Sequence, residues 1–316
     1  MKAYDKDQNN NLYKRDTSER CHIKESIDIK DRGYDWDKPT SLYDVYYEII
    51  GKIGSGGFGS VYKAYQYFKG DKRIVAVKTI PINRFYDEEL LVLRNLASKC
   101  YDDIYKDGCF PYISCYYDDF IGYMDNKQYV FIVTEYIDGL SLRYYSEHLD
   151  KSGYKIRDNW ILILMEEIMI GIAFIHNSGY AHRDLHGNNV MITLDESNGF
   201  QVKILDFGQS CFKNNCDMGV FQTIFEMSGP KPERKYFLPN PNYNLKYAQQ
   251  EDIYSIGLVF YYYLVYSEKT FQYEDEYEYT GTPFDQILKQ MLNKDVNARP
   301  NANELVNQII SLESKL

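Results

Sequence analysis

The spacing of hydrophobic and polar positions divides this chain into a strand-rich part and a helical part. Between Tyr46 and Tyr136 the apolar residues fall into short runs of β-branched and aromatic residues, which is typical of strands. After Gly139 the period changes, and Asn159–Asn177 is a strongly apolar helical stretch with Gly179 as its expected stop. The pattern therefore predicts a mixed α and β chain in which strands come first.

The first part contains several expected strands and one helix. We expect the helix over Arg84–Ala97, an irregular acidic loop over residues 99 to 112, and a turn at Met124-Asp125-Asn126. The run Ile74–Val77 is apolar throughout and predicts a strand buried on both faces. The expected strands are Tyr46–Ile53, Val61–Tyr65, Ile74–Val77, Ile113–Ile121 and Gln128–Tyr136.

The remaining segments are shorter or less regular. Residues 1–44 are polar and charged without periodicity, and we expect a mostly disordered tail. Val190–Thr193 predicts a short strand, which turns through residues 195 to 199 into a second strand ending at Ile204-Leu205. With 316 residues, the chain exceeds the size that one core usually serves, so one two-lobed domain or two domains are expected.

Composition and charge exclude several classes of protein. Hydrophobic residues make up 44% and charged residues 26%, which is ordinary for a globular protein. The net charge of −10 argues against general binding to nucleic acid or to an anionic membrane. The longest apolar stretch, Trp160–Ile175, is interrupted by Glu166-Glu167 and predicts a buried helix rather than a membrane span.

The six cysteines form no C-x-x-C pair, and no signal peptide is recognisable, so we expect reduced intracellular thiols. Cys211 and Cys216 are interpreted as two thiols, with a redox pair as the alternative. The expected location is the cytoplasm. The C-terminal Ser314-Lys315-Leu316 matches a peroxisomal address and provides the alternative.

A glycine-rich segment follows the first expected strand. Gly54-Ser55-Gly56-Gly57-Phe58-Gly59 contains the pattern G-x-G-x-x-G. A dinucleotide-binding fold would place a helix directly after the last glycine, whereas Val61–Tyr65 favours a second strand. Such a hairpin lets backbone N–H groups approach phosphates because no Cβ is in the way, although a plain glycine-rich hairpin fits the pattern too.

A lysine ends the apolar strand that comes next, in Val75-Ala76-Val77-Lys78. A lysine at this place is normally a solvated edge residue, but a carboxylate from the following helix can hold it. Glu89 is favoured for this because Val92, Leu93 and Leu96 form an apolar stripe on its side of the helix, while the stripe beside Glu88 is less complete.

Two further motifs carry acidic and amide side chains. In His182-Arg183-Asp184-Leu185-His186-Gly187-Asn188-Asn189, an Asp and an Asn five residues apart can accept a proton and hold a divalent cation, respectively. In Asp206-Phe207-Gly208, the Asp follows a buried strand, and the nearby glycine permits a turn that directs the carboxylate into a pocket. Each motif taken alone also fits an ordinary polar loop.

These motifs, in this order, resemble a eukaryotic-type protein kinase from about Tyr46 to the C-terminus. Asp252-Ile253-Tyr254-Ser255-Ile256-Gly257 resembles the central helix of the family's large lobe, whose Asp braces the catalytic loop, and Arg299-Pro300 resembles the family's closing arginine. The resemblance implies an α+β, bilobal fold in which 45–138 form a small β-rich N-lobe and 139–316 form a larger helical C-lobe. It also implies ATP and Mg²⁺ as cofactors and a protein as the substrate.

The resemblance implies a role for each motif residue. Lys78, held by Glu89, would position the phosphates of ATP, Asp184 would take the acceptor's proton, and Asn189 and Asp206 would bind Mg²⁺. Thr134 would be the gatekeeper of the nucleotide pocket, and the main chain of Glu135 and Ile137 would bond the adenine edge. The implied nucleotide-binding residues are Ile53, Gly54, Gly56, Gly59, Val61, Ala76, Lys78, Thr134, Glu135, Ile137 and Met191.

The chain also departs from the family pattern. His186 replaces the lysine that serine/threonine kinases usually have two positions after Asp184, and Asn188 stands where tyrosine kinases have an arginine, so neither pattern fits. A serine/threonine acceptor is the expected class. Two alternatives to a protein kinase remain. One is a pseudokinase that acts as a binding scaffold, and the other is a small-molecule phosphotransferase with a kinase-like fold.

The segment that would order a peptide substrate is also atypical. By spacing, Leu238-Pro239-Asn240 replaces the family's A-P-E motif, so an ion pair to Arg299 would become a neutral hydrogen bond; Pro232-Glu233 is the alternative register. Thr223 and Ser228 are candidate sites at which a phosphate near Arg183 would order the segment.

Overall fold

A computed structural model gives the fold of this chain. It describes residues 45–55, 59–68, 71–85, 88–99, 110–152, 156–195, 199–212, 215–216, 244–265, 277 and 279–315. Several sequence predictions lie outside these residues, namely the tail 1–44, the loop 99–112 for the most part, Gly56, Thr223, Ser228, Pro232-Glu233, Leu238-Pro239-Asn240 and Leu316.

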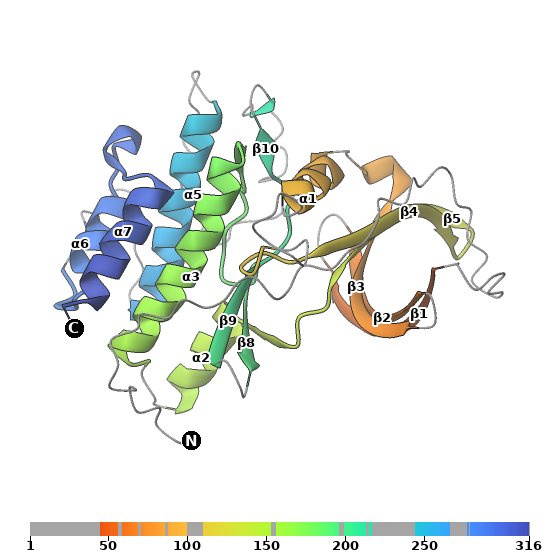
Figure 1. Cartoon of the computed structure of the whole chain (residues 1–316), viewed down its shortest axis with the longest axis horizontal. Coiled ribbons are helices and arrows are strands. Elements are labelled where there is room, and N and C mark those ends of the chain that lie inside the picture. Colours follow the sequence, from red (N-terminus) through yellow and green to blue (C-terminus); the bar gives the residue numbers. More distant parts are fainter. Residues whose placement is uncertain are drawn as a thin grey trace.

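Five antiparallel strands form a strongly curved sheet at one end of the molecule (Figure 1). Their spatial order is β1-β2-β3-β5-β4, with neighbours paired antiparallel. The β4–β5 turn has positive φ at both Asp125 (52°) and Asn126 (61°), a conformation whose twist matches that of the flanking strands. The strands are β1 (Tyr46–Ser55), β2 (Ser60–Phe68), β3 (Asp71–Pro81), β4 (Tyr116–Met124) and β5 (Lys127–Glu135).

The two faces of strand β3 have different surroundings. Val75 and Val77 are fully buried in an apolar cluster with Tyr47 and Phe120. Ile74 points to the opposite face and is 42% exposed, so the prediction of a strand buried on both faces is wrong. The run is apolar, but alternation along a strand still directs neighbouring side chains to opposite faces of the sheet.

Helix α1 (Glu88–Lys99) packs beside the sheet (Figure 1). The predicted helix began at Arg84, which instead ends a short 3₁₀ turn, Ile82–Arg84. Phe85 then has extended backbone angles (φ −83°, ψ 133°), which interrupts the helical hydrogen bonding. As the stripe predicted, Val92, Leu93 and Leu96 are buried, and they belong to the large core that extends into the helical lobe.

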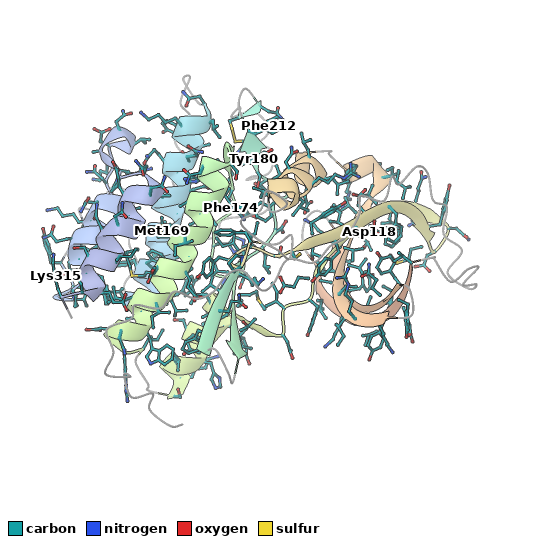
Figure 2. The ribbon with its side chains drawn as sticks, in the orientation of Figure 1. Asp118, Met169, Phe174, Tyr180, Phe212 and Lys315 are labelled. Carbon is teal, nitrogen blue, oxygen red and sulfur yellow. A yellow bond between two sulfur atoms is a disulfide. The ribbon has the colours of Figure 1, made fainter. Side chains whose placement is uncertain are left out.

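The helical lobe is built around α3 (Asp158–Asn177), with Met169 and Phe174 among its inward-facing side chains (Figure 2). By length and hydropathy alone α3 would qualify as a membrane span, but most of its apolar residues are buried in this core, as predicted. Gly179 follows the helix with φ 86°, which favours glycine. The other helices are α2 (Leu142–Ser152), α5 (Leu245–Phe260) continuing into a π-helical turn (Tyr261–Val265), α6 (Asp285–Met291), the 3₁₀ turn Val296–Ala298 and α7 (Ala302–Glu313).

Two small sheets hold the loops that carry the polar motifs. Strands β6 (Gly139–Ser141), β8 (Val190–Asp195) and β9 (Gly199–Ile204) form one sheet in the order β6-β8-β9. Strands β7 (Tyr180–Ala181) and β10 (Cys211–Phe212) form the other. Residues 182–189 therefore connect β7 to β8, and Asp206 lies between β9 and β10.

A disulfide joins Cys211, in β10, to Cys216, and it is visible close to Phe212 (Figure 2). Both cysteines are buried beside Ala181 and Ala248. Cys115 is disulfide-bonded as well. The prediction of reduced thiols is therefore wrong for these three residues. The Cα atoms of Cys211 and Cys216 lie 5.0 Å apart, a separation suited to a disulfide.

Candidate active site

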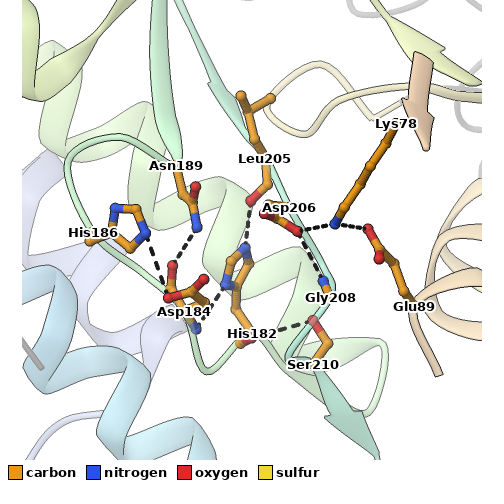
Figure 3. A network of polar contacts seen from close by, with 10 residues as sticks. All are labelled: Lys78, Glu89, His182, Asp184, His186, Asn189, Leu205, Asp206, Gly208 and Ser210. Carbon is orange, nitrogen blue, oxygen red and sulfur yellow. Dashed lines mark hydrogen bonds and ion pairs between the residues drawn. The ribbon is translucent and has the colours of Figure 1, made fainter. Parts of the chain in front are cut away.

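A lysine and two carboxylates from three separate elements meet between the lobes (Figure 3). The Nζ atom of Lys78, on β3, lies 2.7 Å from Glu89 Oε1 on α1 and 2.8 Å from Asp206 Oδ1 after β9. The carboxylate in contact is Glu89, the one favoured by the apolar stripe of the helix. Because Asp206 is 128 residues from Lys78 in the sequence, this contact ties the small lobe to the large one.

Burial and charge act together on this cluster. Burial alone would lower the pKa of Lys78, but Asp206 and Glu89 raise it above its ordinary value. Burial raises the pKa of Asp206, yet the Lys78 ammonium and the hydrogen bond from Gly208 N–H outweigh burial and hold the pKa at about 2. For Glu89, burial dominates and the pKa is raised. At neutral pH the lysine and Asp206 are therefore charged.

The loop that carries Asp184 has a strained backbone fixed by a buried carboxylate. Arg183 has φ 65°, in the left-handed region that non-glycine residues rarely adopt. Asp252, on α5, accepts hydrogen bonds from the backbone N–H groups of His182 and Arg183, both at 2.7 Å. His176 Nε2 lies 3.0 Å from the same carboxylate. Such a conformation persists only when its surroundings determine it, and Asp252 supplies that constraint.

Asp184 and Asn189 are held close together within the loop. The Nδ2 atom of Asn189 donates to the carbonyl oxygen of Asp184 at 2.8 Å, and both side chains are buried. The Asp184 N–H donates to His182 Nδ1 at 3.2 Å, while His182 Nε2 lies 2.9 Å from Leu205 O (Figure 3). Burial lowers the pKa of His182, so its ring is neutral at physiological pH.

The free oxygens of Asp206 and Asn189 suit a hard divalent cation. Asp206 Oδ1 accepts from Lys78 and from Gly208 N–H, while its Oδ2 makes no hydrogen bond to any other described residue. The Asp206 side chain is 39% exposed and thus accessible. Asn189 donates through Nδ2, which leaves its Oδ1 as a possible ligand. No group of three or more His, Cys, Asp or Glu residues suited to a metal occurs in the described parts of the chain.

The strand register places the expected nucleotide-binding residues on one face of the sheet. Gly54 pairs with Val61, and Val61 pairs with Lys78. Ala76, two residues before Lys78, pairs with Thr134 on β5. Directly opposed residues share a face, and so do positions i and i+2, so these five side-chain positions face the same way.

The other expected nucleotide residues flank this face. Ile53 is 51% exposed on β1, and Met191 is half-buried on β8 of the large lobe. Ile137 lies in the segment that connects β5 to β6. The N–H of Glu135 donates to Cys115 O at 2.8 Å, so only its carbonyl can contribute to a bound base.

Gly59 is required by the sheet itself. A Cβ on Gly59 would lie 2.0 Å from the backbone oxygen of Thr79 on β3, far inside any real contact. Gly54 is different, because a Cβ at that position would have Val61 Cβ as its nearest neighbour, at an ordinary 3.8 Å. The close approach of backbones therefore explains Gly59 without any reference to phosphate.

Two residues that support the site were not identified from the sequence. Lys203, on β9, is buried and makes a 2.7 Å ion pair with the Glu135 side chain, which also accepts from Cys115 N–H at 3.3 Å. His176, near the end of α3, braces Asp252. A charged residue in the apolar pattern of β9 was the available signal for Lys203, whereas nothing local marks His176.

Arg299, near the C-terminus, is anchored on main-chain groups. Its Nη1 donates to Gln250 O at 2.9 Å and its Nε to Asn293 O at 2.8 Å. Its guanidinium also lies 4.6 Å from the Tyr254 ring centroid, within cation–π range. The predicted partner Asn240 is outside the described residues. The contacts with Gln250, Asn293 and Tyr254 fix Arg299 to α5 and to the segment that follows α6.

Comparisons with known proteins agree with this geometry. A family model described as "Protein kinase domain" matches residues 47–310. A probable serine/threonine-protein kinase of Streptomyces coelicolor is 30% identical over 215 residues, covering 68% of this chain and 29% of the relative. A probable serine/threonine-protein kinase of Caenorhabditis elegans is 30% identical over 68% of this chain and 26% of its own.

A third relative aligns over more of the chain. The interferon-induced, double-stranded RNA-activated protein kinase of mouse is 28% identical over 283 residues, covering 82% of this chain and 50% of the relative. The chain thus spans half the length or less of these curated relatives.

Proposed function

This chain belongs to the protein kinase family, and from that premise we propose that it transfers the γ-phosphoryl group of ATP to a protein hydroxyl. The observation that carries the proposal is the convergence of Lys78, Glu89 and Asp206 beside the loop of Asp184 and Asn189. These five side chains come from both lobes and from separate parts of the chain, and phosphoryl transfer needs all of their functions at one place.

In the proposed reaction the acceptor hydroxyl oxygen attacks the γ-phosphorus of ATP. The new O–P bond forms as the bond to the β,γ-bridging oxygen breaks, and ADP leaves. Asp184 orients the hydroxyl and takes its proton. Lys78, held by Glu89, positions the α- and β-phosphates, which replace part of its present contact with Asp206. Catalysis then consists mainly of positioning and charge stabilisation.

Protein kinases generally use ATP with Mg²⁺, and we propose Asp206 and Asn189 as the residues that hold the cation here. When bound, Mg²⁺ neutralises phosphate charge during transfer. The accessible Oδ2 of Asp206 and the Oδ1 of Asn189 support this assignment, because hard cations prefer oxygen ligands.

We propose serine or threonine as the acceptor, because the relatives from Streptomyces and Caenorhabditis are named serine/threonine kinases. A test is to incubate purified full-length chain with Mg²⁺ and γ-labelled ATP on peptide arrays in which the acceptor is serine, threonine or tyrosine. Label on serine and threonine peptides supports the proposal, whereas label on tyrosine alone contradicts the acceptor class. Binding of ATP without any transfer would favour the pseudokinase alternative.

A further inference from the structure

Two histidines, four residues apart in the loop that carries Asp184, have the same local geometry. His182 Nδ1 accepts from the N–H of Asp184, two residues later, at 3.2 Å. His186 Nδ1 accepts from the N–H of Asn188, again two residues later and again at 3.2 Å. Both rings are at least 90% buried. The loop therefore uses each imidazole first as the acceptor that closes a local turn.

This geometry fixes the tautomer of each ring. A nitrogen that accepts a backbone N–H carries a lone pair, so the proton of the neutral ring resides on Nε2. In His182, Nε2–H donates to Leu205 O at 2.9 Å. In His186, Nε2 lies 3.6 Å from Asp184 Oδ1, and Figure 3 draws this contact as a dashed line. The same rule thus places an N–H donor of the second histidine beside the proposed base.

We propose that His186 is a positioning residue for Asp184, acting as a neutral Nε2–H donor to its carboxylate, an inference that rests on the proposed kinase function. The present 3.6 Å is about 0.6 Å longer than an ordinary N–H···O hydrogen bond, and catalytic hydrogen bonds often shorten when substrate binds. With Oδ1 held by His186, the carboxylate plane is fixed, and the acceptor hydroxyl meets a base of defined orientation.

The role differs from that of a lysine at this position. A lysine ammonium is a mobile point charge with three donors and no acceptor, so it could not close the turn with Asn188. His186 accepts from that N–H through one nitrogen and faces Asp184 with the other. The substitution of lysine by histidine thus exchanges a mobile charge for a rigid, neutral donor.

Two amide variants separate the functions of the two ring nitrogens. In His186→Asn the side-chain oxygen can still accept from Asn188 N–H, but no donor reaches the place of Nε2. In His186→Gln the longer side chain brings an amide N–H donor to that place. We expect His186→Asn to lower kcat about 10- to 100-fold, which is the cost of a misplaced catalytic group, with KM for ATP unchanged. The kcat of His186→Gln should recover most of this loss.

The experiment measures kcat, KM for ATP and KM for a peptide that the wild-type chain phosphorylates. These constants and Tm are determined for the wild-type full chain and both variants. Lower kcat in His186→Asn at unchanged Tm, with recovery in His186→Gln, supports the proposal. Wild-type kcat in His186→Asn, no recovery in His186→Gln, or a change confined to KM for ATP would overturn it. A wild-type chain that transfers no phosphate would instead contradict the proposed kinase function, so the two failures are distinguishable.

Discussion

Replacing Lys78 by methionine removes the cation that joins two carboxylates. The Glu89 side chain is 8% exposed, and Lys78 is its hydrogen-bond partner among the described residues. Removing one member of a buried ion pair leaves an uncompensated charge, which costs about 3–5 kcal/mol of unfolding free energy. The Asp206 side chain is 39% exposed, so water can replace Lys78 as its partner. Losing the Lys78–Asp206 ion pair therefore adds less than about 1 kcal/mol. Lys78→Met should thus lose a large part of a typical stability of roughly 5–15 kcal/mol.

The second variant, Lys78→Met/Glu89→Gln, tests whether the charge on Glu89 causes this loss. A neutral amide at residue 89 removes the uncompensated charge, so we expect the double variant to recover about 2–3 kcal/mol relative to Lys78→Met, although both variants lack activity. Urea unfolding without nucleotide gives the free energies of the wild type, both single variants and the double variant. The control Lys127→Met, the same change at an exposed position of β5 in the same sheet, should alter stability by less than about 0.5 kcal/mol.

The pH dependence provides an independent check of the role of the Glu89 charge. Burial already raises the pKa of Glu89 above its ordinary 4.5, and loss of Lys78 raises it further. In Lys78→Met the folded state then binds a proton more readily than the unfolded state, so the lost stability should partly return as the pH falls from 8 towards 5. Additive single-variant effects, or a loss that is the same at both pH values, would refute the account of a buried charged pair.

Three further predictions concern other parts of the molecule. Gly59→Ala should lose about 1–3 kcal/mol by urea unfolding because its Cβ meets a backbone oxygen at 2.0 Å, whereas Gly54→Ala should be nearly neutral, and equal losses would contradict this. Cys211→Ser, Cys216→Ser and the double variant should each lose the same amount, about 2 kcal/mol, under non-reducing conditions, and additive losses would argue against the disulfide. The folded protein lowers the pKa of Asp206 from 3.8 to about 2, so the ionised side chain stabilises the folded state above pH 4 and this contribution disappears as the pH falls to 2. After solvent screening the contribution is about 1 kcal/mol, and the acid unfolding curve of Asp206→Asn should lack it.

The sequence predicted those parts of the fold that depend on local patterns. Short β-branched runs indicated the strands, and the apolar stripe beside Glu89 indicated which of two adjacent glutamates turns inward, where it contacts Lys78. Apolar content did not predict the environment of Ile74, because exposure depends on what covers each face of the sheet. The start of α1 was also missed, since Phe85 leaves the helical conformation without a proline or glycine as a signal.

The resemblance implied that Asp252 braces the loop of Asp184, as its hydrogen bonds from His182 and Arg183 show, but the other supporting contacts could not be predicted because they join distant segments. His176 and Asp252 are 76 residues apart, and Glu135 and Lys203 are 68 apart, so no local pattern connects either pair. A bond between Cys211 and Cys216 was the alternative to two thiols, and the sequence favoured the thiols because nothing in it shows that the two Cα atoms approach to 5.0 Å.

The central claim is that the gathered side chains transfer a phosphoryl group and that Asp184 is the base. Single-turnover transfer from γ-labelled ATP to a serine peptide, measured for the wild-type chain and Asp184→Ala with the Kd for ATP determined in parallel, tests it most directly. We predict label transfer by the wild type, and a rate at least about 100-fold lower in Asp184→Ala with an unchanged Kd. Near-normal transfer by Asp184→Ala, or none by the wild type, would contradict the account.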